Sequence, residues 1–85
     1  MMFYTEEWLT EAEDELALLW MQAPDKLAIT QAQAAIEKLL RSDPTGHGTP
    51  LGEELWKLAV PPLVVYYTID TPRSLVEVSW VARTS

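Results

Sequence analysis

The sequence predicts an α+β domain in which two helices pack on one face of a small antiparallel sheet, in the order β-α-α-β-β-β. The last third of the chain contains three β-type runs separated by short breaker segments. Two helix-patterned segments precede these runs, with no strand between them. At 85 residues, 48% of them hydrophobic, the chain is long enough for a single core, so residues 1–85 are expected to form one domain.

The N-terminal part of the chain predicts an edge strand followed by a helix. Residues 3–9 have the composition of a strand, and their side chains alternate between two faces. Thr10 and Glu13 have the spacing of a capping box, so the helix is expected to cover residues 10–22. Its apolar stripe consists of Ala12, Leu16, Leu19, Trp20 and Ala23.

A second helix is expected to follow Pro24, with Asp25 as its N-cap, and to end before Asp43 and Pro44. Its apolar stripe consists of Ala28, Ile29, Ala32, Ala35, Ile36, Leu39 and Leu40. The alanines allow the two helices to approach closely. Residues 45–50, which contain two glycines and a proline, are expected to form a mobile loop.

Three strands form the predicted C-terminal meander, with residues 63–70 at its centre. Pro61-Pro62 and the turn at residues 71–74 are short joints, which require antiparallel neighbours. The rows assigned to the core are Leu63, Val65, Tyr67 and Ile69; Trp56, Leu58 and Val60; and Val76, Val78, Trp80 and Ala82. The opposite face, expected to remain open, carries Lys57, Ala59, Val64, Tyr66, Thr68, Glu77, Ser79, Val81 and Arg83.

Charge is distributed unevenly along the chain. The net charge is −7, and residues 1–25 contain seven acidic residues but no Lys or Arg. Acids at the start of the first helix complement its positive dipole end, which makes solvated acids the simpler explanation; the alternative is an acidic docking patch. In either case the negative field disfavours binding of phosphate.

Cofactor and metal sites are not expected. His47 is the single histidine, and it lies between Gly46 and Gly48 with no second ligand at usable spacing. We therefore expect a solvated loop histidine rather than a general base. Without cysteine there is no disulfide, and with neither a signal sequence nor a membrane span the expected location is the cytoplasm.

Four segments of the chain form a set: WLTEAEDELALLW at residues 8–20, APD at 23–25, IEKLLRSDP at 36–44 and PLVVYYTID at 62–70. Together with the element order, they resemble the RelE/ParE superfamily of toxin–antitoxin (plasmid-stabilisation) toxins. The resemblance implies a bacterial type II toxin that a small antitoxin wraps and neutralises. It also implies two branches: RelE-like toxins cleave mRNA in the ribosome, and ParE-like toxins inhibit DNA gyrase.

The resemblance implies that RelE-like nucleases hold RNA with basic residues on the open sheet face and use a C-terminal Arg followed by Tyr or His. Only Lys57 and Arg83 match this pattern, whereas Val64 stands where the family commonly has Arg. Two cations without a placed acid or base are a poor set for RNA cleavage. The sequence therefore favours a ParE-like toxin that binds a protein. The alternatives are an mRNA endonuclease with Lys57 and Arg83 as catalytic residues, and an inactive relic that serves as an interaction module.

Two surfaces are candidate contacts for a partner. Val64, Tyr66 and Val81 form a semi-apolar patch on the open face, where an antitoxin is expected to bind; alternatively they only stabilise the sheet as cross-strand neighbours. Leu18 and Met21 lie outside the apolar stripe of the first helix. Either the N-terminal strand or a loop covers them, or they contact an antitoxin or a second copy of the chain.

Overall fold

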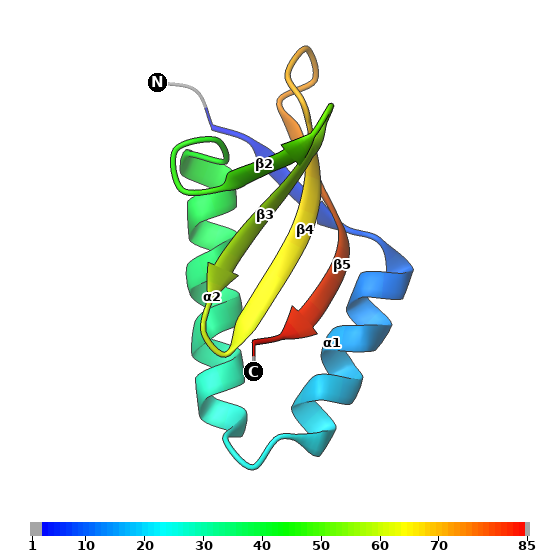
Figure 1. Ribbon diagram of the computed structural model, residues 1–85, viewed down its shortest axis with the longest axis vertical. Helices are drawn as coiled ribbons and strands as arrows, with labels where there is room; N and C mark the ends of the chain where they lie inside the picture. Colours follow the sequence, from blue (N-terminus) through cyan, green and yellow to red (C-terminus); the bar gives the residue numbers. More distant parts are fainter. Residues whose placement is uncertain (1–2, 85) are drawn as a thin grey trace.

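Two helices pack on one side of a five-stranded sheet: in Figure 1 the second helix passes behind the strands and the first lies alongside the C-terminal strand, while no helix crosses the front of the sheet. The computed structural model describes residues 3–84. Its elements are β1 (Thr5–Trp8), α1 (Thr10–Gln22), α2 (Lys26–Ser42), β2 (Thr49–Gly52), β3 (Leu55–Val60), β4 (Leu63–Asp70) and β5 (Leu75–Arg83). This confirms the predicted α+β class and the predicted order, to which the structure adds one strand, β2.

The sheet is mixed rather than wholly antiparallel. Its strand order is β1-β5-β4-β3-β2, and the four C-terminal strands form an antiparallel meander. The N-terminal strand β1 lies at an edge, as predicted, and pairs in parallel with β5, with Thr5 opposite Leu75. A parallel pair needs a long crossover connection, and here the two helices and the meander supply it.

The added strand β2 corrects the expectation of a mobile loop at residues 45–50. Thr49 and Pro50 pair with β3, and all four residues of β2 are exposed. Proline lacks the N–H that a ladder needs, but an edge strand tolerates it because one side of the strand has no neighbour. The glycine and proline content predicted a loop for all of residues 45–50. Pairing with β3 instead makes Thr49 and Pro50 the start of a short edge strand.

Both helices begin differently from the sequence expectation. α1 covers the predicted residues, but its N-cap is Leu9 and no side chain caps it, so the capping-box prediction for Thr10 and Glu13 is wrong. Asp25 does occupy the N-cap position of α2, yet its carboxylate makes no capping hydrogen bond. Helix formation here depends on the apolar stripes that pack on the sheet more than on side-chain caps.

An extra residue in β5 reverses the direction of the side chains that follow it. Tyr66 of β4 pairs with Trp80, but the next residue, Tyr67, pairs with Val78, so Ser79 forms a β-bulge. Up to Val78 the alternation follows the prediction. After the bulge the two faces are exchanged, because each strand residue points opposite to the one before it.

The core lies between the helices and the sheet. Leu63, Val65 and Tyr67 of β4 are fully buried, as are Ile29, Ile36 and Leu40 of α2 and Ala12 of α1. The Tyr67 hydroxyl donates a hydrogen bond of 2.5 Å to the carbonyl oxygen of Pro44. Burial, with a smaller contribution from Asp43, raises the pKa of Tyr67 to about 12. This bond ties the end of α2 to the central strand.

The close approach at this point explains Gly48. A Cβ atom at position 48 would lie 1.9 Å from the Tyr67 hydroxyl oxygen and 3.1 Å from the Pro44 carbonyl oxygen. Any side chain at position 48 would therefore displace the loop or the tyrosine.

Candidate functional site

The uncovered side of β3, β4 and β5 presents one continuous set of side chains, which we call the open face. Cross-strand pairing places Lys57 opposite Tyr66, and Tyr66 opposite Trp80. Neighbouring pairs on the same side complete the set. The open face consists of Leu55, Lys57, Ala59, Val64, Tyr66, Thr68, Glu77, Trp80 and Ala82.

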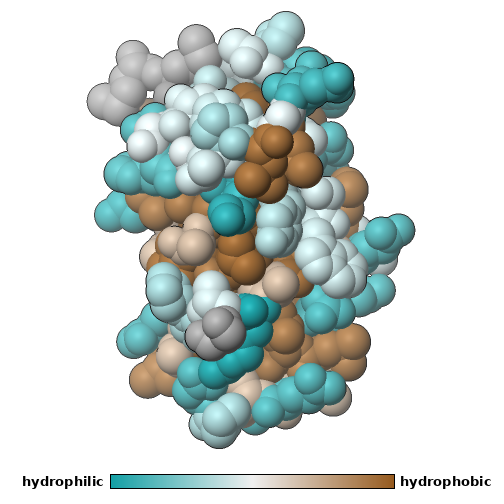
Figure 2. Space-filling view, in the orientation of Figure 1, coloured by the Kyte–Doolittle hydropathy of each residue, from teal (hydrophilic) through white to brown (hydrophobic). Residues whose placement is uncertain are grey.

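Apolar and aromatic surface dominates the centre of the open face. Figure 2 looks onto this side of the molecule and shows brown and white surface through its middle, interrupted by a few teal groups, with further teal residues at the margins. The Trp80 side chain is 43% exposed and that of Leu55 is 39% exposed. Tyr66 and Trp80 are direct cross-strand neighbours, so two aromatic rings stand together in the middle of this surface.

Positive charge on the open face is limited to Lys57. The chain has six Lys and Arg residues, all within the part that the structure describes, and only Lys57 belongs to this set. Arg83 was expected on the open face, but the bulge turns it to the helix side, opposite Leu63. There its Nη2 donates to both carboxylate oxygens of Asp25 at 3.0 Å. The hydrogen bond from Arg83 holds the pKa of Asp25 below its ordinary value.

The expected position on the open face is confirmed for Val64 and Tyr66 and wrong for Val81. Val64 and Tyr66 lie on the open face and are half-buried. Val81 is fully buried opposite Val65, whereas Trp80, expected in the core, takes the exposed position. Regular alternation placed the larger Val81 in solvent and the small Ala82 in the core, and that imbalance was the one sequence signal for a bulge.

A second surface feature is a groove between α1 and α2, on the opposite side of the sheet from the open face. Its volume is about 640 Å³, and Trp8, Leu16, Ala17, Trp20, Met21 and Ile29 form its apolar walls. Glu13, Gln33 and Glu37 are the polar residues that line it. Trp20 was expected in the core but is 43% exposed, because it forms part of this groove.

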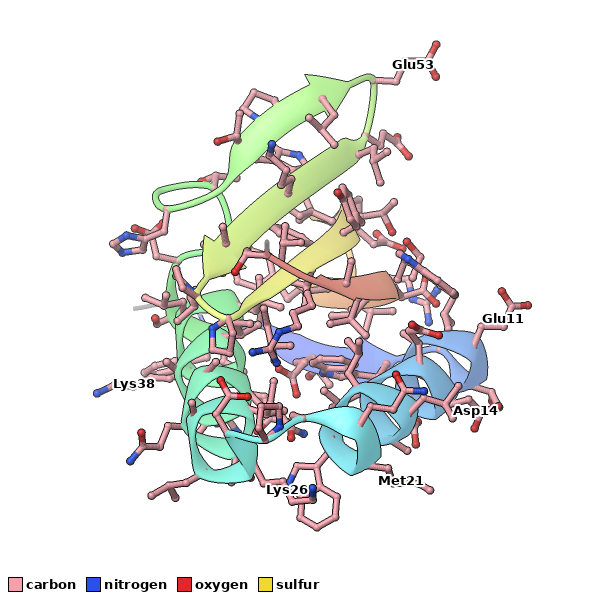
Figure 3. All side chains as sticks on the ribbon, turned by 60° about the horizontal axis from the view of Figure 1, so that its bottom comes forward. Glu11, Asp14, Met21, Lys26, Lys38 and Glu53 are labelled. Carbon is pink, nitrogen blue, oxygen red and sulfur yellow. The ribbon has the colours of Figure 1, made fainter. Side chains whose placement is uncertain are left out.

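Leu18 and Met21 are both exposed, at 48% and 65%, so neither the N-terminal strand nor a loop covers them. Met21 lines the inter-helix groove, whereas Leu18 does not. Figure 3 shows Met21 and Lys26 together at one end of the helical layer, with Glu11 and Asp14 pointing outward from α1. The structure therefore separates two residues that the sequence had grouped.

A carboxylate of β1 lies behind the groove. Burial raises the pKa of Glu6, and the nearby Glu37 carboxylate raises it further. The Trp8 indole and the Arg41 guanidinium act in the opposite direction. Trp8 Nε1 and Glu6 Oε2 are both buried; the Trp8 side chain interacts with the Glu6 carboxyl group, but neither atom makes a hydrogen bond of regular geometry within residues 3–84. This end of the groove thus combines crowded negative charge with buried polar atoms.

The fold has close counterparts among solved structures. A chain of the toxin–antitoxin complex RelBE2 from Mycobacterium tuberculosis superposes with a TM-score of 0.79 at 20% identity, over 98% of this chain and 93% of that chain. The isolated E. coli RelE toxin gives 0.69 at 15% identity, over 96% and 85% of the two chains. The intact E. coli RelBE complex gives 0.68 at 14% identity, over 96% and 98%. The chain has the fold of the RelE toxins.

The chain matches no protein-family model. No curated protein matches its sequence significantly either. At such low identities the likeness concerns the fold, so the chemistry must be judged from the residues present.

Within the RelE-type fold, the two candidate catalytic residues do not meet. Lys57 lies on the open face, whereas Arg83 is bound to Asp25 on the helix side. His47 is exposed on the loop after α2, with Nε2 4.0 Å from Asp43 Oδ2. Residues 3–84 contain no group of three or more acidic or histidine side chains arranged to hold a metal ion. None of their helices is long and apolar enough to cross a membrane.

Proposed function

We propose that this chain is the toxin of a type II toxin–antitoxin pair and acts by binding a protein, as ParE-like gyrase inhibitors do. Its antitoxin covers the open face. The observation that carries this proposal is the composition of that face: two adjacent aromatic rings, Tyr66 and Trp80, beside a single cation, Lys57. The RelE-type fold, whose solved counterparts include toxin–antitoxin complexes, supports the pairing with an antitoxin.

The charges argue against RNA as the substrate. Cleavage of RNA by its 2′-hydroxyl requires a base, an acid and cations that stabilise the negatively charged transition state. Lys57 is the sole Lys or Arg residue of the open face. Arg83 lies on the other side of the sheet, where it is already paired with Asp25. Single-stranded nucleic acid is usually held by several cations interleaved with aromatic rings. The open face has the rings but not the cations.

The apolar content argues for a polypeptide. Protein interfaces have an apolar and aromatic centre with a polar rim, and tryptophan and tyrosine are frequent energetic hot spots. If the open-face residues served only to stabilise the sheet, their neighbours should bury them. Trp80 instead leaves 43% of its surface exposed next to Tyr66. A partner that covers this pair gains the burial that the domain itself does not provide.

The test is inducible expression in bacteria, alone and together with an antitoxin-sized product of a neighbouring gene. We expect growth arrest from the chain alone and rescue by the second product. Trp80→Ser should abolish the arrest and the antitoxin binding, whereas Leu27→Ser, a matched change of an exposed residue on α2, should preserve both. Unchanged growth on induction of the wild-type chain would contradict toxicity and favour the inactive relic.

The branch is decided by two assays on the purified protein. The proposal predicts inhibition of DNA supercoiling by gyrase and intact mRNA in translating ribosomes. The endonuclease is the second candidate, because Lys57 lies directly beside Tyr66 on the open face. It predicts shortened mRNA and loss of growth arrest in Lys57→Ala, whereas the proposal expects Lys57→Ala to remain toxic.

A further inference from the structure

The groove between α1 and α2 is a second exposed apolar surface that the proposed function does not use. We propose that it is a docking site for a positively charged, apolar-anchored segment of a protein partner. This inference concerns a different side of the molecule and does not depend on toxicity or on the occupant of the open face.

The groove has the size and walls of a binding site. A volume of about 640 Å³ accommodates a few side chains of a bound segment. Trp8 and the first turns of α1 lie at one end, and Trp20 and Met21, from the last turn of α1, lie at the other. Trp20 and Met21 remain 43% and 65% exposed, so the domain leaves this hydrophobic surface uncovered.

The charges lining the groove all have one sign. Glu13 and Glu37 are its ionisable residues, and no Lys or Arg lines it. Glu37 also disfavours ionisation of the neighbouring Glu6, which shows that negative charge is crowded at this end. Arg41 of α2 partly offsets that charge but does not line the groove. A positive group in the groove beside Glu37 would relieve this repulsion.

The opposite end of the groove is already supplied with a cation. The Lys26 ammonium lies 5.3 Å from the centre of the Trp20 ring and donates to the carbonyl oxygen of Ala23 at 2.9 Å. This end therefore favours an apolar group. The groove is thus polarised: a basic side chain fits beside Glu13 and Glu37, and an aliphatic or aromatic side chain fits beside Met21 and Trp20.

The negative charge beside Glu13 and Glu37 also disfavours the other possible occupants of the groove. A second copy of the chain carries the same net charge of −7, and nucleic acids and anionic lipid surfaces are negative as well. An amphipathic basic segment satisfies both properties of the groove, because helix-in-groove recognition combines apolar anchors with a charged rim. It is the occupant to which we commit.

The test uses the full chain and a short synthetic amphipathic peptide with leucine anchors and arginines, monitored by amide chemical shifts. We expect shifts along the groove and binding about tenfold tighter than that of the same peptide with glutamate in place of arginine. Ala17→Arg places a cation in the groove and should weaken binding of the arginine peptide about tenfold. The matched change Ala34→Arg, on an exposed site of α2 outside the groove, should have little effect.

A second pair of variants keeps the test valid if Ala17→Arg does not fold. Glu13→Gln with Glu37→Gln should remove most of the preference for the arginine peptide, whereas Glu11→Gln with Glu53→Gln should retain it. Equal binding of both peptides, binding of neither, or self-association of the chain that Ala17→Arg abolishes would overturn the proposal.

Discussion

The open face and the inter-helix groove are similar in apolar character and different in charge. Each exposes a tryptophan, Trp80 on the open face and Trp20 in the groove, and each is 43% exposed. Lys57 and Glu77 balance one another on the open face, whereas Glu13 and Glu37 make one end of the groove negative. Exposed apolar side chains therefore favour binding of a partner at both surfaces, and the charge of each surface determines which charge its partner must carry.

The largest expected effect comes from removing the bulge that creates the open face. Deleting Ser79 would restore regular alternation, so Trp80 would turn into the core and Val81 out of it. We expect a loss of about 3–5 kcal/mol in the free energy of unfolding, because a buried valine is lost and an oversized ring is forced in. Urea denaturation measures it. Ser79→Ala, which keeps the residue count, should cost much less, and a deletion variant of wild-type stability would contradict the assignment of the bulge.

The second prediction compares adjacent tyrosines that face opposite sides of the sheet. Tyr67→Phe removes the hydroxyl that donates to the Pro44 carbonyl and leaves that oxygen unpaired in a buried region. It should lower the free energy of unfolding by about 1–2 kcal/mol. Tyr66→Phe, on the open face, should leave stability nearly unchanged. Thermal unfolding of both variants measures these effects. Equal losses of stability in the two variants would contradict the assignment of Tyr67 to the core and Tyr66 to the open face.

The third prediction concerns the negative charge behind the groove. The pKa of Glu6 is raised above its ordinary value of 4.5, so the folded state binds its proton more tightly than the unfolded state. Glu6 therefore costs stability as the pH rises above 4.5. Glu6→Gln should stabilise the protein at pH 7 by at most about 1 kcal/mol, and the gain should shrink as the pH falls through the raised pKa and disappear below 4.5. Chemical denaturation across this range tests the sign, with Glu77→Gln on the open face as the control.

The smallest expected effect separates the two candidate catalytic residues. Asp25 has a pKa held below its ordinary value of 3.8 by Arg83, so this pair stabilises the fold above pH 3.8, and the contribution disappears as the pH falls through the lowered pKa. Arg83→Ala should give a small fall in Tm at neutral pH that vanishes in acid, since the pair is partly exposed. Lys57→Ala should not change Tm at either pH. A pH-independent effect of Arg83→Ala would show that the ion pair is not its cause.

Regular patterns in the sequence were sufficient for most of the fold. The bounds of α1 and of the central strand β4 agree with the prediction, because an apolar stripe and a period-two row each extend over several turns or pairs. The bulge at Ser79 is marked in the sequence only by the order of Val81 and Ala82, because it depends on how β5 pairs with β4. It changed the positions of Trp80, Val81 and Arg83, and with them part of the predicted site.

Tertiary context also explains the remaining differences. Trp20 belongs to the predicted stripe of α1, but α2 stands far enough away to leave a groove, so the ring remains exposed. Local sequence cannot specify that distance, which depends on packing along both helices. The strand β2 likewise exists only through its pairing with β3. Single-element patterns predicted the elements, and contacts between elements determined the surfaces.

The position of β5 between β1 and β4 has a consequence for synthesis of the protein. The strand that is translated last occupies an interior place in the sheet, and it is the single strand partner of β1 within residues 3–84. A nascent chain therefore cannot complete its sheet until β5 has emerged from the exit tunnel. Because Trp80 belongs to β5, the aromatic pair of the open face is assembled only at that late moment.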